Sequence, residues 1–456
     1  MGSLLNNLEI GKRALDAQRL GITVTGHNLA NLNTPNFARQ QAEFDVGTHG
    51  MPLAGVDITE VRQIRDRLLD ERVRRHTQNF TGADAQSNRL REMEALFSDL
   101  SGEGITDSMA AFWDAWQDLT TSPESEAARI TAIGRGETLA SQFRRLHSEV
   151  QQLHQDIDSE VRGKVNQINQ ILESVASLNR SISVIEADSG QNANEQRDTR
   201  EAQLAELSKL INFRAVEGEN GSVKVLVGGI ALVDHTEVTT LEMRKTNSDD
   251  AVGGAPITEI SVLGGTGLKI TGGELAGLIE VRDTHLPEVT QRMDELASVL
   301  MQTVNALHKQ GYGLDGSTGL DFFVGDGVAN ISVNAQLQAD AKKLAVAATP
   351  DAEGDNQVAL AIAQLRYEKL FGEGTQTAEE FNSSTVGLVG LQLQRAQRQA
   401  ENDALVVQQL TNLQQSISGV SIDEELAKMI QFQRAYEAAA RYVTTVDDLL
   451  ETLVNM

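Results

Sequence analysis

Apolar residues recur at coiled-coil spacing at both ends of this 456-residue chain. Near the start they stand seven apart, at Leu8, Leu15, Ile22 and Leu29. Near the end they recur at helical spacing, at Met429, Phe432, Tyr436, Val443, Leu450 and Leu453. These patterns predict two helices, over residues 4–29 and 422–453, that each need a partner to cover an apolar stripe. Because isolated helices of this length are marginal in water, we expect both to be disordered in the monomer and to pair as a coiled coil.

A longer apolar stripe occupies the middle of the chain. It runs from Leu139 to Ile185 and predicts one helix of more than forty residues, followed by an antiparallel helix over 194–210. Ser122 followed by Pro123 is typical of a helix start, and we expect Gly134 and Gly136 to interrupt that helix before its main run. Further helical patterns cover residues 65–100, 106–119, 273–308, 357–371 and 378–417.

Short extended segments separate the helical ones. Residues 38–46 and 56–64 predict short strands, and residues 211–270 predict a β insertion because valines alternate at 223, 225 and 227 between paired glycines. We therefore expect an elongated, mainly α protein with an inserted β module, of the α+β class. The predicted domains are a terminal coiled coil (1–35 with 418–456), a long-helix bundle (36–210 with 273–417) and a β-rich outer domain (211–272).

Composition and charge exclude several classes of function. The formal net charge of −26 would repel nucleic acids and anionic membranes, so we expect neither as a partner. The chain has no cysteine, which excludes disulfides and thiolate metal sites. It also has no run of about 18 apolar residues, and its first residues do not form a Sec-type signal. We expect no membrane insertion.

Residues that could support catalysis or metal binding form no recognisable motif. His147 and His154 stand seven apart on one predicted helix, without the His-Glu-x-x-His spacing of a zinc site. Asp315 and Asp321 lack the ligand ladder of a calcium loop. We expect no catalytic residue, no cofactor and no metal. A cell-wall hydrolase stays an open alternative, because carboxylates are plentiful enough to supply a glycosidase-like pair.

One cluster of basic residues interrupts the acidic chain. Six arginines stand in the segment from Arg62 to Arg75, interleaved with Asp66, Asp70 and Glu71. The simplest interpretation is a solvated helix face crossed by salt bridges. A sharper hypothesis is that this face meets an acidic face of a neighbouring identical subunit.

The segment that follows the first predicted helix resembles a known signature. Its matching residues are Asn28, Ala30, Asn31, Thr34, Pro35 and Phe37. They are similar to the N-terminal motif of the bacterial flagellar axial proteins of the rod, hook and hook–filament junction, except that Asn36 stands where glycine is usual. Asparagine is the other residue that tolerates a left-handed turn. Segments over 197–233, 282–323 and 423–436 are similar to the hook-associated members of this family.

The resemblance implies a non-enzymatic structural protein of the extracellular flagellum, exported by the flagellar type III apparatus. It implies as partners further copies in a ring or helical layer, the hook protein, a second junction protein and an export chaperone on the C-terminal helix. We expect assembly by coupled folding and polymerisation of the terminal helices. The alternatives are another axial protein, from the hook, rod or second junction, and a cytosolic coiled-coil scaffold. A large outer domain of longer relatives is expected to be absent or reduced.

Overall fold

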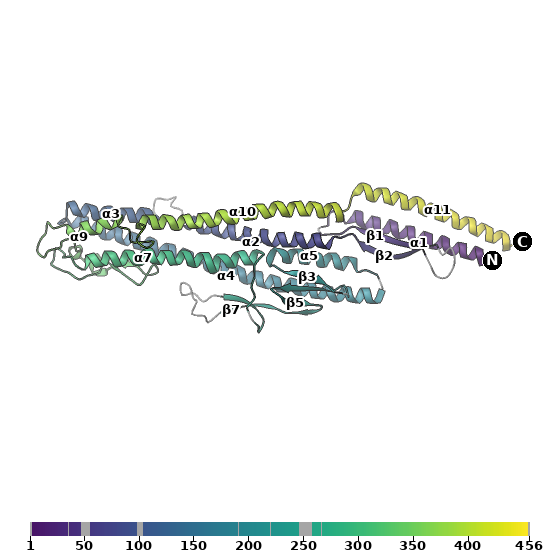
Figure 1. Ribbon diagram of the computed structural model, residues 1–456, viewed down its shortest axis with the longest axis horizontal. Coiled ribbons are helices and arrows are strands. Elements are labelled where there is room, and N and C mark those ends of the chain that lie inside the picture. The colour runs from purple at the N-terminus through teal and green to yellow at the C-terminus, as the bar shows by residue number, and fades with distance from the viewer. Residues whose placement is uncertain are drawn as a thin grey trace.

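The computed structural model is a long rod of helices with a β-rich insertion on one side (Figure 1). It describes residues 2–34, 36–46, 55–97, 104–189, 191–218, 220–245, 258–265 and 267–454. The predicted fold class, an elongated mainly α protein of the α+β type, is confirmed. Both ends of the chain lie at the same end of the rod (Figure 1).

The helices account for most of the described chain, and their bounds follow. They are α1 (Gly2–Ala30), α2 (Arg67–Phe97), α3 (Ile105–Thr121), α4 (Glu126–Ser189), α5 (Asn194–Leu210), α6 (Glu274–Glu280), α7 (Leu286–His308), α8 (Ala335–Ala339), α9 (Gln357–Gln364), α10 (Ala378–Ser418) and α11 (Ile422–Val454). A π-helical turn, Val281–His285, joins α6 to α7.

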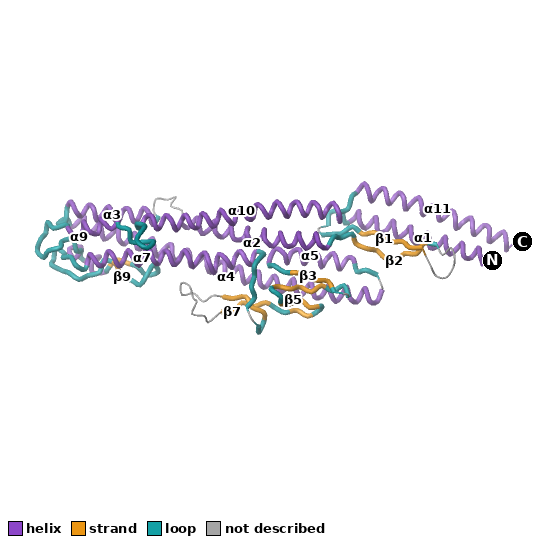
Figure 2. Tube along the Cα trace, in the orientation of Figure 1, coloured by secondary structure: helices purple, strands orange, loops and turns teal. Residues whose placement is uncertain are grey.

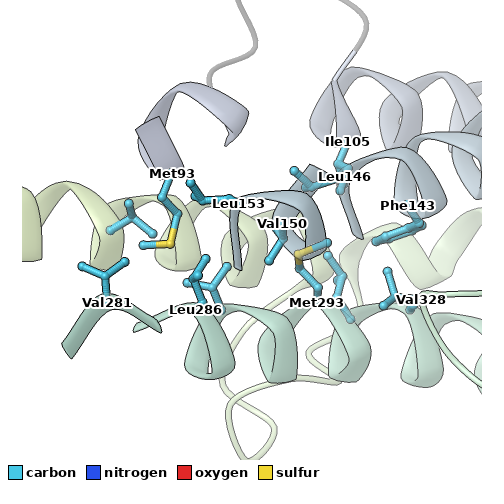
Figure 3. Packing of buried hydrophobic residues seen from close by; sticks show 14 of the residues in the cluster. Met93, Ile105, Phe143, Leu146, Val150, Leu153, Val281, Leu286, Met293 and Val328 are labelled. Atoms are coloured by element: carbon cyan, nitrogen blue, oxygen red, sulfur yellow. The ribbon is translucent and has the colours of Figure 1, made fainter. Parts of the chain in front are cut away.

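Four long helices form the shaft of the rod. Helix α10 packs antiparallel along α2, because Asp70 near the start of α2 contacts Gln414 and His76 contacts Asp403. Helices α4 and α7 pack beside them, and buried apolar side chains from α2, α4 and α7 meet in the middle of the shaft (Figure 3). Figure 3 shows Val150 and Met293 pointing toward one another there.

Helix α4 is continuous over 64 residues, which confirms the long helix and corrects two predictions about its start. It begins at Glu126 instead of Ser122, because Pro123 stays in a turn whose carbonyl oxygen accepts from Nε of buried Arg129 at 3.0 Å. The glycines do not interrupt it. A Cβ on Gly136 would lie 2.7 Å from the Phe322 ring, so this glycine permits close packing within the helix.

Strands occupy three regions beside the helices (Figure 2). Their bounds are β1 (Gln40–Val46), β2 (Val56–Gln63), β3 (Arg214–Glu217), β4 (Val223–Val227), β5 (Ile230–Asp234), β6 (Glu237–Val238), β7 (Leu241–Lys245), β8 (Thr258–Val262), β9 (Phe323–Val324) and β10 (Ser332–Val333). β1 and β2 form an antiparallel hairpin beside α1. The predicted β insertion holds a four-stranded antiparallel sheet in the order β3-β4-β5-β6 and a β7–β8 hairpin.

Two asparagines of α4 attach the β insertion to the shaft. Asn179 is fully buried; its Oδ1 accepts from the Val223 amide at 3.0 Å and its Nδ2 donates to the Val223 carbonyl at 2.8 Å. Asn169 makes the same pair of bonds with the amide and carbonyl of Leu241. A side-chain amide has one acceptor and one donor group, so it can pair with the backbone amide and the carbonyl of one strand residue. These two asparagines thus make the hydrogen bonds that a neighbouring strand would make with β4 and β7.

The far end of the rod is closed by an aromatic cluster. Phe112 and Trp116 of α3 lie 5.7 Å and 5.4 Å, between ring centroids, from Phe322, and His308 lies 5.8 Å from the same ring. The helix predicted over residues 357–371 is shorter than expected. It ends at Gln364 and a 3-10 turn, because Phe371 leaves the helical path to stack on Phe381 at 5.1 Å.

Candidate assembly site

The terminal helices α1 and α11 pack side by side at one end of the rod (Figure 1). They run antiparallel, because Gly11 meets Val443 whereas Gly21 meets Phe432. A Cβ atom added to Gly11 would lie 2.5 Å from Val443 Cγ2, and one added to Gly21 would lie 2.8 Å from the Phe432 ring. The two glycines therefore allow an approach that any side chain would prevent.

The apolar stripe predicted on α1 is only half-buried in the single chain. Its members Leu8, Leu15, Ile22 and Leu29 all keep part of their surface open, whereas Ala17 on another side of the helix is fully buried. The structure thus leaves apolar surface along α1 that α11 does not cover.

The residues predicted on α11 also keep part of their surface exposed. Met429, Phe432, Val443 and Leu450 are half-buried, and Tyr436 is 39% exposed. Pro35 and the side chain of Leu453 lie outside the described residues. The participation of these predicted residues in contacts between copies stays a prediction.

A buried polar joint holds the terminal pair at its inner end. Asn28, which is 1% exposed, donates from Nδ2 to Glu425 Oε2 at 2.9 Å and to the Gln40 carbonyl at 2.8 Å. Its Oδ1 accepts from the Gln40 amide at 2.9 Å. Arg39 completes the joint, because its Nε donates to Glu425 Oε1 at 2.8 Å. Glu425 is 1% exposed, so the charge of its carboxylate is buried. Arg39 neutralises this charge, and Asn28 supplies a hydrogen bond in place of water.

The same joint reaches the shaft of the rod. The Arg39 amide donates to the Ser418 carbonyl at the end of α10 at 2.9 Å. Arg65 donates to Asp198 Oδ1 at 2.7 Å and to the Asn36 carbonyl at 2.7 Å, which connects the loop after α1 to α5. Burial raises the pKa of Asp198, and the neighbouring Arg65 offsets part of that rise. The terminal helices, α5 and α10 are therefore connected through a few side chains.

The other residues of the recognised motif shape the turn after α1. Asn31 donates from Nδ2 to the His27 carbonyl at 3.0 Å and accepts from the Thr34 hydroxyl at 3.2 Å. Phe37 packs edge-on against the His27 ring at 5.5 Å, and Ala30 is exposed. Asn36 has φ of 61°, so the asparagine in place of glycine does adopt the left-handed conformation.

Sequence reasoning did not select Glu425, Arg39, Asp198 or Arg65 as site residues. Glu425 stands in the first turn of α11, where a carboxylate also suits the helix dipole, so an acidic residue there did not stand out. Its partner Asn28 lies 397 residues away, and no local spacing connects the two. The signal that could have selected them is the presence of Arg39, Asp198 and Glu425 inside segments that resemble the axial family.

Three members of the arginine cluster form ion pairs with other elements of the fold. Arg65, Arg67 and Arg74 form ion pairs with Asp198, Glu217 and Glu201 at 2.7, 2.7 and 2.8 Å. These partners belong to α5 and β3, so most of the observed pairs join elements instead of crossing one helix face. The side chains line a cavity of ≈ 650 Å³ between α2, α5 and β3.

Two further observations bear on the predicted absence of a chemical site. Within the residues that the structure describes, no three His, Cys, Asp or Glu side chains gather in a way that would hold a metal ion. None of the described helices has both the length and the apolar composition that a membrane crossing requires. His154 is half-buried on α4, and burial lowers its pKa.

A helical rod, a β insertion and termini held together by a buried joint define an elongated, mainly α protein of the α+β class. The family model described as "Flagellar hook-associated protein FlgK helical domain" matches residues 90–323, more than half of the chain. The model described as "Flagellar basal body rod FlgEFG protein C-terminal" matches residues 414–456. The chain belongs to the FlgK family of flagellar hook-associated proteins.

Individual relatives agree with the family match. Flagellar hook-associated protein 1 of Bacillus subtilis is 26% identical, with 100% of this chain and 99% of that protein covered. Its Escherichia coli counterpart is 22% identical, with full coverage of both chains. The solved structure of the flagellar hook junction protein FlgK from Burkholderia pseudomallei has the same fold, with a TM-score of 0.66 over 76% of this chain and 100% of that one, at 15% identity.

Proposed function

We propose that this protein is the structural junction between the flagellar hook and filament, and that it is not an enzyme. The relatives named hook-associated protein 1 cover the whole chain, which supports this role. The alignment with the Escherichia coli relative runs over 558 positions against 456 residues here, so that relative has segments without a counterpart. This supports the expectation of a reduced outer domain.

The observation that carries the proposal is the uncovered apolar surface of the terminal pair. Ile422, Leu426 and Ile430 stand four residues apart, share one side of α11, and are 46%, 42% and 51% exposed. Complete burial of such a side chain is worth roughly 1.5–3 kcal/mol. Neighbouring subunits that cover this side would therefore stabilise both the pair and the contact.

The proposed mechanism is coupled folding and polymerisation. In the isolated chain the terminal pair is marginally stable, because α11 packs mainly against α1 and leaves Ile422, Leu426 and Ile430 exposed. A neighbour that binds only the paired state shifts the equilibrium toward pairing by mass action. The joint at Glu425 then connects the ordered pair to α5 and α10.

The proposed partners are further copies in a ring or helical layer, the hook protein and a second junction protein. Export by the flagellar type III apparatus and a chaperone on the C-terminal helix complete the proposal, because an uncovered stripe on α11 would need protection before assembly. The division into a terminal pair, a long-helix bundle and a β-rich outer domain belongs to the same proposal.

A second candidate is another axial protein of the rod or hook. The match of residues 414–456 to the rod-protein C-terminal model favours it, because that terminal segment is shared. The match of residues 90–323 to the hook-associated helical domain favours the junction.

Electron microscopy of a deletion strain tests the proposal. We expect complete hooks without filaments, and filament protein released into the medium; truncated rods without hooks would indicate the second candidate. In the complemented strain, Leu15→Asp should abolish filament attachment, because the charge falls on the half-buried stripe. Thr23→Asp on the exposed side of α1 is the matched control and should retain filaments. Normal filaments in the deletion strain would overturn the proposal.

A further inference from the structure

The end of β2 and the start of α2 present a positively charged surface, which we call the arginine face: Arg62, Arg67, Arg72 and Arg75. All four residues are exposed. Arg62 and Arg67 make ion pairs with Glu43 and Glu217 while their side chains stay 62% and 74% open. Among the described residues, Arg72 and Arg75 have no ion-pair partner. The exposed Glu71 between them reduces the local charge only in part. In a chain of net charge −26, this surface is an exception whose charge its own fold neutralises only in part.

The outer end of α11 has the opposite charge. Asp447, Asp448 and Glu451 are exposed, and the last basic residue of the chain is Arg441. Within the described part of the chain none of the three carboxylates has an ion-pair partner. We call these three residues the acidic tip.

The two charged surfaces cannot meet within one chain. Glu425 fixes the inner end of α11 at the joint, close to Arg65 and the arginine face. Asp448 lies 23 residues further along a straight helix, which places the acidic tip about 35 Å away. A second copy displaced along the rod by that distance would bring its acidic tip to the arginine face of the first.

We infer that the arginine face of one copy receives the acidic tip of the next copy. The contact is heterologous, since different surfaces of the two copies meet, and it therefore continues from copy to copy instead of closing on itself as a dimer. This inference rests on the proposed assembly role of the terminal pair and assigns the polar contact that accompanies it.

This contact determines how neighbouring copies align along the rod more than it strengthens their binding to one another. Exposed ion pairs contribute little to stability individually, whereas complementary charges steer association and penalise wrong alignments. The apolar stripes of α1 and α11 tolerate sliding by one helical turn. An arginine face and an acidic tip a fixed distance apart favour one displacement.

Another acidic segment offers a control for this assignment. Asp351 and Glu353 are exposed, and they belong to the loop before α9 at the opposite end of the rod (Figure 1). The same segment contains Asp355, whose carboxylate accepts from the amides of Ala348 and Thr349, so this loop has a local structural role. A contact there would require a different arrangement of copies.

Charge exchange tests the inference in the full-length chain, expressed in a strain that lacks the chromosomal copy. Arg72→Glu with Arg75→Glu should reduce filaments per cell by about tenfold, as expected when like charges replace an attractive pair. Adding Asp447→Lys with Asp448→Lys to the same chain should restore filaments, because every copy supplies both surfaces. Adding Asp351→Lys with Glu353→Lys should not. Far-UV circular dichroism of each purified variant verifies that the helices of the rod are folded.

Three outcomes would overturn the inference: normal filaments in the Arg72→Glu, Arg75→Glu strain, no restoration by the reversed tip, or equal restoration by the loop variant. Arg91→Glu, at an exposed arginine further along α2, is the matched control and should be silent. The deletion strain separates this inference from the proposed function. Absent filaments in the deletion strain together with normal filaments in the Arg72→Glu, Arg75→Glu strain would sustain the junction role and reject the charge contact.

Discussion

Asn28 and Glu425 are joined by a hydrogen bond of 2.9 Å although 397 residues separate them in the sequence. The bond connects the end of α1 to the first turn of α11, and Arg39 donates to the same carboxylate from the loop after α1. Closure of the joint therefore requires both ends of the chain at once. Neither terminal helix can satisfy it alone.

Glu425→Gln should weaken the terminal pair. The neutral amide removes the buried charge of the Arg39–Glu425 ion pair and leaves Arg39 only the exposed Glu424 as an ionic partner. Loss of one member of a buried ion pair costs about 3 kcal/mol. We expect fewer filaments to remain attached after graded shear. Glu424→Gln is the control, because Glu424 also reaches Arg39 but is 61% exposed. Equal shear resistance of the two variants would contradict a structural role for the joint.

Gly21→Ala should destabilise α1 although alanine is the better helix former. The added methyl would meet the Phe432 ring at 2.8 Å, and overpacking of this kind costs roughly 1–3 kcal/mol. Gly26→Ala, on the same helix with no atom within 4 Å of the new Cβ, should instead stabilise α1 by about 0.5–1 kcal/mol. Hydrogen–deuterium exchange of the α1 amides measures the effect of both substitutions. We expect exchange to become faster in Gly21→Ala and slower in Gly26→Ala.

Asn179→Ala should release β4 from α4. The substitution leaves the buried amide and carbonyl of Val223 without partners, and each unsatisfied group costs about 1–3 kcal/mol. Amide exchange in β4 and β5 should accelerate while exchange in α7 stays unchanged. Asn166→Ala, an exposed asparagine on the same helix, should leave both unaffected. Slow exchange at Val223 in the Asn179 variant would show that the sheet does not depend on this contact.

The stability of the far end of the rod should fall in mild acid because of His308. Nε2 of this fully buried residue accepts from the Ala345 amide at 3.0 Å, so Nδ1 bears the proton that is donated to the Leu320 carbonyl at 2.7 Å. Burial lowers the pKa of His308 to about 4, below its ordinary value of 6.5. The neutral ring therefore stabilises the folded state fully above pH 6.5. This stabilisation, about 3 kcal/mol in all, is lost as the pH falls toward 4.

Urea unfolding at pH 7 and at pH 4.5 measures this loss. The fluorescence of Trp116, whose ring centroid lies 6.5 Å from that of His308, is a local probe. His308→Asn should lower stability at pH 7 and remove this part of the pH dependence. His235→Asn, at an exposed histidine of the β insertion, should preserve it. An unchanged pH profile in the His308 variant would assign the effect to other groups.

Sequence patterns predicted the elements of this fold better than the contacts between them. The stripe from Leu139 to Ile185 identified the continuous part of α4, because periodicity reports the buried side of a helix directly. Gly136 was misjudged because its role depends on the Phe322 ring, which arrives from nearly two hundred residues away. A glycine that permits close packing and a glycine that ends a helix are identical in the sequence.

The residues of the candidate assembly site likewise divide into those that local sequence patterns predict and those that depend on distant contacts. The heptad stripes at Leu15 and Phe432 are local, so they were visible, as was the motif around Asn28. Glu425 was hidden because its environment is created only when the two ends of the chain meet. Helix dipoles and exposed faces explain most acidic residues near helix starts, and nothing local distinguishes the one that becomes buried.

The position of both chain ends at the tip of the terminal pair has a practical consequence for labelling (Figure 1). A fluorescent protein fused to either end would be placed beside the surface that we expect to assemble, and loss of motility in such a strain would be an artefact of the reporter. Gly229, in the turn between β4 and β5, has no atom within 4 Å of an added Cβ. Strand β5 lies beside the middle of the rod (Figure 1). A small tag inserted there would leave both ends free during live imaging.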